Sequence, residues 1–232
     1  YIQSREADEE TESIVEAQLP FLRWLVSNSA LKNDSILLKL SRYVGGMTAV
    51  SAGSVMRFRS ARVYDGFFET LENDEKLRGL EDFFYTMGIE CRLILEKLPD
   101  GNRELYFFHE KLVPFFDTAS SGTLALFDLY RRLMLSVREP SFIYLDEFDA
   151  FYHYEMAENV IRFFKKNYPK CQIVMTSHNT NLMTNRLMRP DCLFILSGEG
   201  TLTALCSATE RELREGHNLE KMYISGEFEQ YE

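Results

Sequence analysis

The feature that most constrains this chain is a short apolar run that ends in two adjacent carboxylates. Residues 141–147 read Ser-Phe-Ile-Tyr-Leu-Asp-Glu, so Asp146 and Glu147 directly follow four apolar residues. A short apolar run between helical segments is typical of a strand buried on both faces of a parallel sheet. The carboxyl ends of such strands face the crevice where α/β proteins bind ligands. We therefore expect the acid pair to lie beside a ligand; the alternative is a strand end capped by solvated acids.

A second apolar run, residues 172–175, leads directly into the polar quartet Thr-Ser-His-Asn at 176–179. If the two strands are adjacent, His178 lies near Asp146 and Glu147, although a histidine after a strand can also be structural. This combination suits a magnesium nucleotide. Asp146 would hold Mg²⁺, usually through water, Glu147 would polarise the attacking water, and His178 would bond a phosphate oxygen or that water.

A third polar segment, residues 118–123 (Thr-Ala-Ser-Ser-Gly-Thr), precedes a helical run at 124–135. The N–H groups at a helix start, together with the helix dipole and a glycine that allows close approach, make a site for an anion. Ser120, Ser121 and Gly122 are thus candidate phosphate contacts. An ordinary serine N-cap is the alternative.

Residues 1 to about 87 are charge-rich and show helical patterning. Helices are expected within 14–26, where Pro20 disturbs the pattern, and at 31–44 and 77–87. In the stretch 47–64, three arginines alternate with aromatic residues. A solvated helix face is favoured there over a nucleic-acid patch.

From residue 89 the pattern changes to strands. Two strands around Pro-Asp-Gly-Asn at 99–102 predict a β-hairpin, and helices and apolar strands alternate after it. This order predicts an α/β fold with a mostly parallel sheet and an additional helical lobe. The expected segments are the hairpin strands 89–98 and 103–109, helices 121–137, 154–167 and 179–187, and strands 142–145, 171–175 and 192–196.

Composition excludes several classes. The chain has 232 residues, with 26 Lys+Arg against 36 Asp+Glu and a formal net charge of −10, which argues against a surface that binds nucleic acid throughout. No apolar run approaches the roughly 18 residues of a membrane span, so no membrane partner is expected. The four cysteines have no CxxC spacing and are expected to be buried, reduced thiols of a cytoplasmic protein: Cys91, Cys171, Cys192 and Cys206.

The order of the three polar segments resembles the C-terminal half of an ABC-type ATPase head, over about residues 89–205. In this resemblance, residues 119–123 correspond to the signature motif, residues 142–147 to Walker B and His178 to the switch histidine. The resemblance implies a P-loop NTPase fold, ATP and Mg²⁺ as cofactors, and ATP hydrolysis. It also implies a homodimer or larger homo-oligomer, in which each protomer offers its signature serine to the partner's nucleotide.

Residues 146–153 (Asp-Glu-Phe-Asp-Ala-Phe-Tyr-His) look like the DEPExxLHP pattern of OLD-like defence ATPases, with Asp149 and His153 at the matching acidic and histidine positions. Phe148 replaces the proline of that pattern, and Ser121 stands where transporters have glycine. The tail at 216–228 is similar to PARIS-type and abortive-infection ATPases. This branch implies a bacterial anti-phage ATPase that controls a separate toxin or nuclease effector.

Two other functions remain open at this point. An SMC or recombination-type DNA-repair ATPase would share the head and would add DNA as a partner. A non-catalytic scaffold would use the acids and the histidine structurally. A TOPRIM nuclease is not expected, because Glu199 and Gly200 are better explained by a hairpin turn into residues 201–205.

The sequence contains no GxxxxGK[ST] phosphate-binding loop. If the resemblance holds, the P-loop is expected before Tyr1, and hydrolysis requires it. Residues 1–87 would then form a helical lobe or insertion, and residues 88–232 the C-terminal part of the ATPase domain.

Overall fold

The computed structural model describes residues 21–51, 65–135 and 139–231. The part of the predicted 14–26 helix before residue 21 lies outside the described residues, as does the part of the 47–64 stretch from residue 52 onward.

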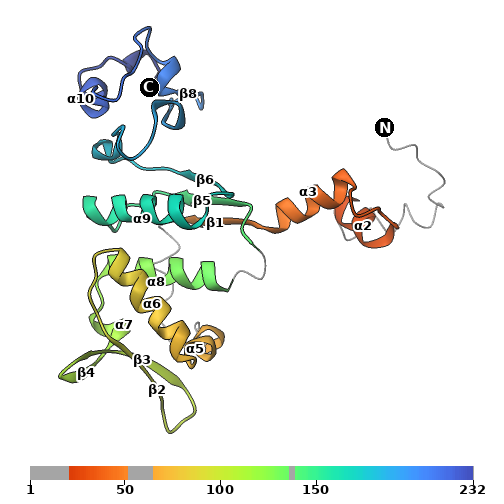
Figure 1. Ribbon diagram of the computed structural model, residues 1–232, viewed down its shortest axis with the longest axis vertical. Helices are drawn as coiled ribbons and strands as arrows, with labels where there is room; N and C mark the ends of the chain where they lie inside the picture. The colour runs from red at the N-terminus through yellow and green to blue at the C-terminus, as the bar shows by residue number, and fades with distance from the viewer. Residues whose placement is uncertain (1–20, 52–64, 136–138, 232) are drawn as a thin grey trace.

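The centre of the molecule is a three-stranded parallel sheet in the order β1-β5-β6 (Figure 1). Its strands are β1 (Met47–Ser51), β5 (Phe142–Asp146) and β6 (Gln172–Met175). In the register, Ser51 lies opposite Asp146, and Leu145 lies opposite Met175. The carboxyl ends of all three strands therefore meet at one edge, and the predicted α/β fold with a parallel sheet is confirmed.

Strand β1 corrects the sequence prediction, which favoured a helix face from residue 47 onward. Its residues alternate between exposed and half-buried, and Val50 packs against the main core. The preceding helix ends at Gly45, and Gly46 lies so close to Ser141 that an added Cβ would approach the serine hydroxyl to 2.8 Å. This close approach brings β1 alongside β5, so tertiary pairing decides the conformation of these five residues.

Two predicted helices pack on one face of the sheet. They are α8 (Ser121–Met134) and α9 (Tyr154–Asn167), and α9 forms the crossover between β5 and β6. On β5, Ile143 and Leu145 are buried in the core shared with these helices, whereas alternate residues are only half-buried. The expectation that the strands are buried on both faces is therefore wrong for the described residues.

A second layer packs against α8 through an aromatic core, in which Phe115 and Phe127 have ring centroids 5.2 Å apart. The β2–β3 hairpin was predicted, whereas β4 was not. The elements are α5 (Asp65–Leu71), α6 (Asp74–Thr86), β2 (Leu93–Lys97), β3 (Arg103–His109), β4 (Lys111–Pro114) and α7 (Phe115–Thr118).

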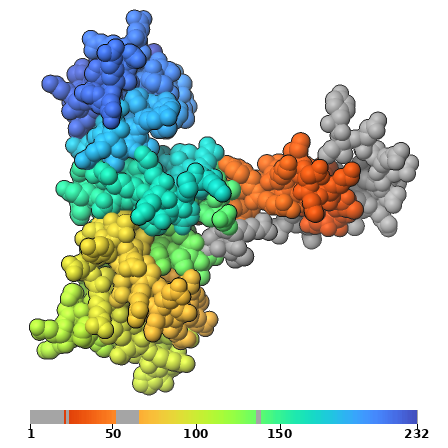
Figure 2. Space-filling view, in the orientation of Figure 1, coloured from red at the N-terminus to blue at the C-terminus, as the bar shows by residue number. Residues whose placement is uncertain are grey.

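Two N-terminal helices, α2 (Phe21–Asn28) and α3 (Ile36–Gly45), project from the body as an arm (Figures 1 and 2). The C-terminal part lies on the other side of the sheet from α5 and α6 and has its own small core. It contains β7 (Phe194–Leu196), β8 (Leu202–Ala204), α10 (Leu219–Ile224) and the 3₁₀ turns η2 (Thr180–Leu182), η3 (Pro190–Cys192), η4 (Leu205–Ser207) and η5 (Glu229–Tyr231).

Two predictions fail in the C-terminal part. The helix expected at 179–187 is only the turn η2, because the Asn179 side chain accepts a hydrogen bond from the N–H of Asn181, and such local bonds compete with helix formation. The strand expected at 192–196 is not part of the parallel sheet; β7 pairs antiparallel with β8. The predicted hairpin turn into residues 201–205 is confirmed.

The cysteines also differ from expectation. All four are free, but Cys192 and Cys206 are exposed, and Cys91 and Cys171 are half-buried. Over the described ranges, the structure contains no helix whose length and apolar character would allow it to cross a membrane.

The aromatic core yields a stability prediction. Phe127 is fully buried against Phe67, Phe115 and Phe116, so Phe127→Ala should lower the free energy of unfolding by about 3–5 kcal/mol in urea titrations. The control Tyr85→Ala removes a ring that is 71% exposed and should change it by no more than about 0.5 kcal/mol. Equal effects of the two changes would contradict this description of the core.

Candidate active site

The predicted acid pair and histidine meet at the carboxyl edge of the sheet. Asp146 ends β5, Glu147 follows it, and His178 lies just beyond the end of β6. The Nε2 atom of His178 lies 3.6 Å from Oε1 of Glu147. The imidazole is 91% exposed and the Glu147 side chain 56% exposed, so both can reach a ligand from solvent.

Thr176 forms hydrogen bonds that connect the ends of β5 and β6. Its hydroxyl donates a hydrogen bond to Oδ1 of Asp146 at 2.9 Å and accepts one from the main-chain N–H of Glu147 at 2.8 Å. Its own N–H donates to the carbonyl of Leu145, and its carbonyl accepts from the N–H of Phe148. Thr176, the residue that follows β6, thus bonds the chain both just before Asp146 and just after Glu147.

Two more hydroxyls reach Asp146. Tyr144 donates to Oδ1 at 3.1 Å, and Ser51 at the end of β1 lies 3.4 Å from Oδ2. The hydrogen bond to the carboxylate is the main reason why the pKa of Tyr144 is raised above its ordinary value of 10. The Asp146 carboxylate is therefore held in a defined orientation by side chains from all three strands or their ends.

Sequence reasoning missed these hydroxyl groups as parts of the site. Tyr144 could have been found, because positions two apart on a strand share a face and Tyr144 precedes Asp146 by two. Thr176 was visible as the first polar residue after β6. Ser51 had no signal, because β1 was not predicted.

Glu147 has an unusual backbone. Its φ is +46°, in the left-handed region that residues other than glycine rarely adopt. Such conformations cost about 1–3 kcal/mol and persist where the surroundings impose them. The bonds from the N–H groups of Glu147 and Phe148 to Thr176 supply that restraint.

The predicted signature segment begins α8. Ser120 is the N-cap, and its hydroxyl accepts the N–H of Thr123 at 3.1 Å. The phosphate contact of this segment stays a prediction. Ser121 is exposed, whereas Gly122 is buried. A Cβ on Gly122 would lie 2.7 Å from the carbonyl oxygen of Phe151, so only glycine allows α8 to approach the loop after Glu147 this closely.

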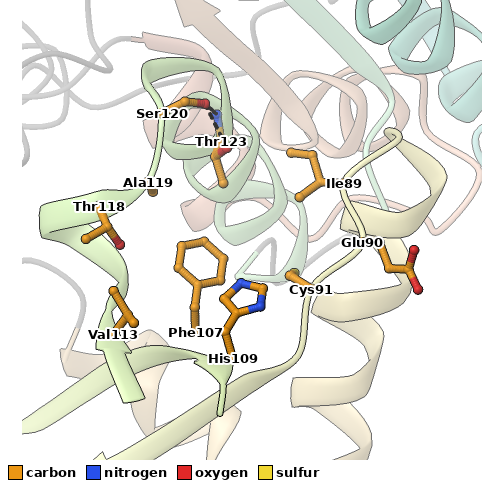
Figure 3. A pocket seen from close by; sticks show the side chains of 10 residues that line it. All are labelled: Ile89, Glu90, Cys91, Phe107, His109, Val113, Thr118, Ala119, Ser120 and Thr123. Atoms are coloured by element: carbon orange, nitrogen blue, oxygen red, sulfur yellow. Dashed lines mark hydrogen bonds between the residues drawn. The ribbon is translucent and has the colours of Figure 1, made fainter. Parts of the chain in front are cut away.

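A cavity of about 370 Å³ adjoins this segment, between the β2–β3–β4 sheet and the start of α8 (Figure 3). Burial and the charge of Glu81 raise the pKa of the Cys91 thiol in its wall to about 11, so this thiol is protonated at neutral pH. The lining residues are Ile89, Glu90, Cys91, Phe107, His109, Val113, Thr118, Ala119, Ser120 and Thr123.

Asp149 and His153, the two other candidates, take part in local turn and helix-cap contacts. His153 is the N-cap of α9, and its Nδ1 accepts the N–H of Met156 at 3.3 Å. The carbonyl of Asp149 accepts the N–H of Tyr152 in a turn. Within the described residues, neither side chain forms a hydrogen bond or ion pair with Glu147 or His178.

The segment after His178 is anchored to α9. The Glu158 carboxylate on α9 accepts a hydrogen bond from the Tyr154 hydroxyl at 2.5 Å. It also forms ion pairs with Arg186 and, at 3.6 Å, with Arg162. Burial alone would raise the pKa of the Glu158 carboxyl, but the bonds from Tyr154 and Arg186 and the nearby positive charges lower it below 4.5. The carboxylate form therefore ties the segment to the helix.

The donor set at the sheet edge fits magnesium. No group of three or more His, Cys, Asp and Glu side chains that could hold a metal ion occurs in the described ranges. Mg²⁺ usually takes one or two carboxylates and completes its shell with water and substrate phosphates. Asp146, with its oriented carboxylate, is the residue that would hold it.

The sequence comparison identifies the family. The family model described as "AAA domain, putative AbiEii toxin, Type IV TA system" matches residues 25–184, which is more than half of the chain. The chain belongs to this AAA family. The match contains β1, β5 and β6 together with every candidate residue named above, and it crosses the division proposed at residue 87.

The solved structures that match part of the chain include heads of SMC ATPases. The SMC head domain from Thermotoga maritima is 18% identical over 64% of this chain and 53% of that chain, with a TM-score of 0.40. The Smc head from Pyrococcus furiosus bound to the C-terminal domain of ScpA is 22% identical over 44% of this chain and 28% of that chain, with a TM-score of 0.34. No curated protein matches the chain.

The contact between Gly122 and Phe151 can be tested. Gly122→Ala should lower the free energy of unfolding by about 1–3 kcal/mol, because the added methyl would overlap the Phe151 carbonyl. Gly66→Ala on α5 meets nothing within 4 Å and should be neutral or stabilising by up to about 1 kcal/mol. Urea unfolding of both variants checks the difference; a neutral Gly122→Ala would contradict the close approach.

Glu158 gives a pH prediction. A carboxyl whose pKa is lowered by folding stabilises the native state at pH values above 4.5, and this contribution is lost as the pH falls through the native pKa. The difference in unfolding free energy between the wild type and Glu158→Gln should therefore be full at pH 7 and shrink below pH 4.5. Urea titrations at both pH values measure it, and a constant difference would contradict the assignment.

Proposed function

We propose that this chain carries the acid, histidine and signature parts of an ATP-hydrolysing site of the AAA/ABC kind. The observation that supports it best is the 3.6 Å approach of His178 to Glu147, beside an Asp146 carboxylate held by hydroxyls. These groups lie at the carboxyl edge of a parallel sheet, where α/β proteins bind nucleotides.

Each residue of the edge would have a separate task. Asp146 would hold Mg²⁺, which neutralises charge on the phosphates when it is bound. Glu147 would orient and polarise the attacking water, and His178 would bond the γ-phosphate or that water. Both groups are exposed, so a triphosphate could reach them from solvent.

The signature segment would act on a second protomer. Ser120, Ser121 and Gly122 would face the partner's γ-phosphate, and the helix dipole of α8 would add positive potential. The exposed position of Ser121 at the first turn of a fourteen-residue helix supports this role. Because the sequence has no GxxxxGK[ST] motif, the phosphate-cradling loop would come from residues outside positions 1–232.

The biological setting belongs to the same proposal. The family description names the AbiEii toxin, and the sequence pattern after Glu147 resembles OLD-like and PARIS-type defence ATPases. The protein would thus act in the bacterial cytoplasm in anti-phage defence, as an oligomer that regulates a separate toxin or nuclease. Copurification of such an effector would support this setting. DNA-stimulated turnover without an effector would instead support the DNA-repair alternative.

The catalytic assignment is tested by two substitutions in the full-length protein. Glu147→Gln should slow ATP hydrolysis by about 10²–10⁴-fold and leave nucleotide binding largely intact, because it removes a general base. Asp146→Asn should also weaken binding of the magnesium nucleotide. Phosphate release and equilibrium binding of a fluorescent ATP analogue measure the two effects.

The matched control is Glu199→Gln, which changes an exposed carboxylate in the β7–β8 turn. It should hydrolyse ATP at the wild-type rate. Hydrolysis by Glu147→Gln at the wild-type rate would contradict the proposed function.

A further inference from the structure

We infer that Thr176 is the positioning residue of the active site, since one hydroxyl sets both the Asp146 carboxylate and the backbone of Glu147. The inference rests on the proposed function and extends it to a residue that contacts neither water nor nucleotide in that scheme. Its basis is the pair of bonds at 2.9 Å to Asp146 Oδ1 and 2.8 Å from the Glu147 N–H.

The direction of both bonds follows from hydroxyl chemistry. A threonine hydroxyl has one hydrogen to donate, and an ionised carboxylate can only accept. The hydrogen of Thr176 must therefore point to Asp146, and its lone pair receives the Glu147 N–H. Neither bond can reverse, because the N–H can only donate and the carboxylate can only accept. One hydroxyl therefore couples the orientation of the Asp146 carboxylate to the position of Glu147.

This coupling has a structural consequence because the backbone of Glu147 has a positive φ. At φ +46°, the residue is held in a conformation that an unrestrained chain would leave. Thr176 restrains it from both sides, because its hydroxyl accepts the N–H of Glu147 and its carbonyl accepts the N–H of Phe148 at 3.1 Å. In this conformation, the Glu147 carboxylate lies 3.6 Å from Nε2 of His178. Releasing it would let the general base move away from its water.

Substitutions can separate the hydroxyl from the shape of the side chain. Thr176→Val keeps the branched shape but removes the hydroxyl, and Thr176→Ser keeps the hydroxyl. Thr184→Val is the matched control, because the buried hydroxyl of Thr184 has no hydrogen-bond partner. Glu147→Gln serves as the reference for loss of the general base.

In the full-length protein, Thr176→Val should lower kcat by about 10–100-fold and raise the Mg²⁺ concentration for half-maximal hydrolysis, as the loss of residues that orient metal ligands typically does. Binding of ATP without Mg²⁺ should be unchanged. Thr176→Ser should restore most of the activity, and Thr184→Val should resemble the wild type. Wild-type kcat and Mg²⁺ dependence in Thr176→Val, with Glu147→Gln inactive, would overturn the inference while the proposed function stands.

A second measurement does not depend on hydrolysis. Amide hydrogen exchange at Glu147 should be faster in Thr176→Val than in the wild type or Thr176→Ser, because the bond from its N–H to Oγ1 is lost. Unchanged exchange would overturn the inference. Hydrolysis that is absent from the wild type, or that does not depend on Glu147, would instead refute the proposed function, and the exchange result would still decide whether Thr176 holds Glu147.

Discussion

The in-register parallel pairing of β1, β5 and β6 is the constraint on which the site depends. Pairing places Ser51 opposite Asp146 and Leu145 opposite Met175, so the residues that follow each strand emerge at the same edge. A shift of one residue would turn every side chain of the displaced strand to the other face. The hydroxyls of Ser51 and Thr176 could then no longer reach the Asp146 carboxylate.

Two sets of charged groups among the described residues differ in their surroundings. Asp128 and Glu158 are buried, and arginines satisfy them: Arg131 and Arg132 bond Asp128 at 2.6 and 2.7 Å. These pairs hold helices and loops in place, because an unpaired buried charge is strongly destabilising. Glu147 and His178, in contrast, are exposed and touch each other only at 3.6 Å. They are positioned by the backbone and left accessible to solvent, which is what the proposed function requires of them.

Short-range sequence patterns predicted part of the fold and some of the candidate site residues. The apolar run before Asp146 predicted β5, and the helix pattern of residues 154–167 predicted α9. The polar residues after two strands indicated Glu147 and His178 as candidates, and the structure places them 3.6 Å apart. The remainder depends on tertiary structure. Strand β1 forms because Gly46 lets the chain approach Ser141. The hydroxyls of Ser51 and Thr176 reach the Asp146 carboxylate only because β1 and β6 pair with β5 on its two sides. The role of His153 as a helix cap likewise follows from where α9 begins.

In the proposed function, residues distant in the chain converge on one magnesium-bound triphosphate. The most direct test is a structure of the full-length Glu147→Gln protein with ATP and Mg²⁺. We expect the metal beside Asp146, the γ-phosphate beside position 147 and His178, and the start of α8 from a second protomer against the same phosphate. A nucleotide bound elsewhere, with this edge of the sheet in contact with neither phosphate nor metal, would contradict the account.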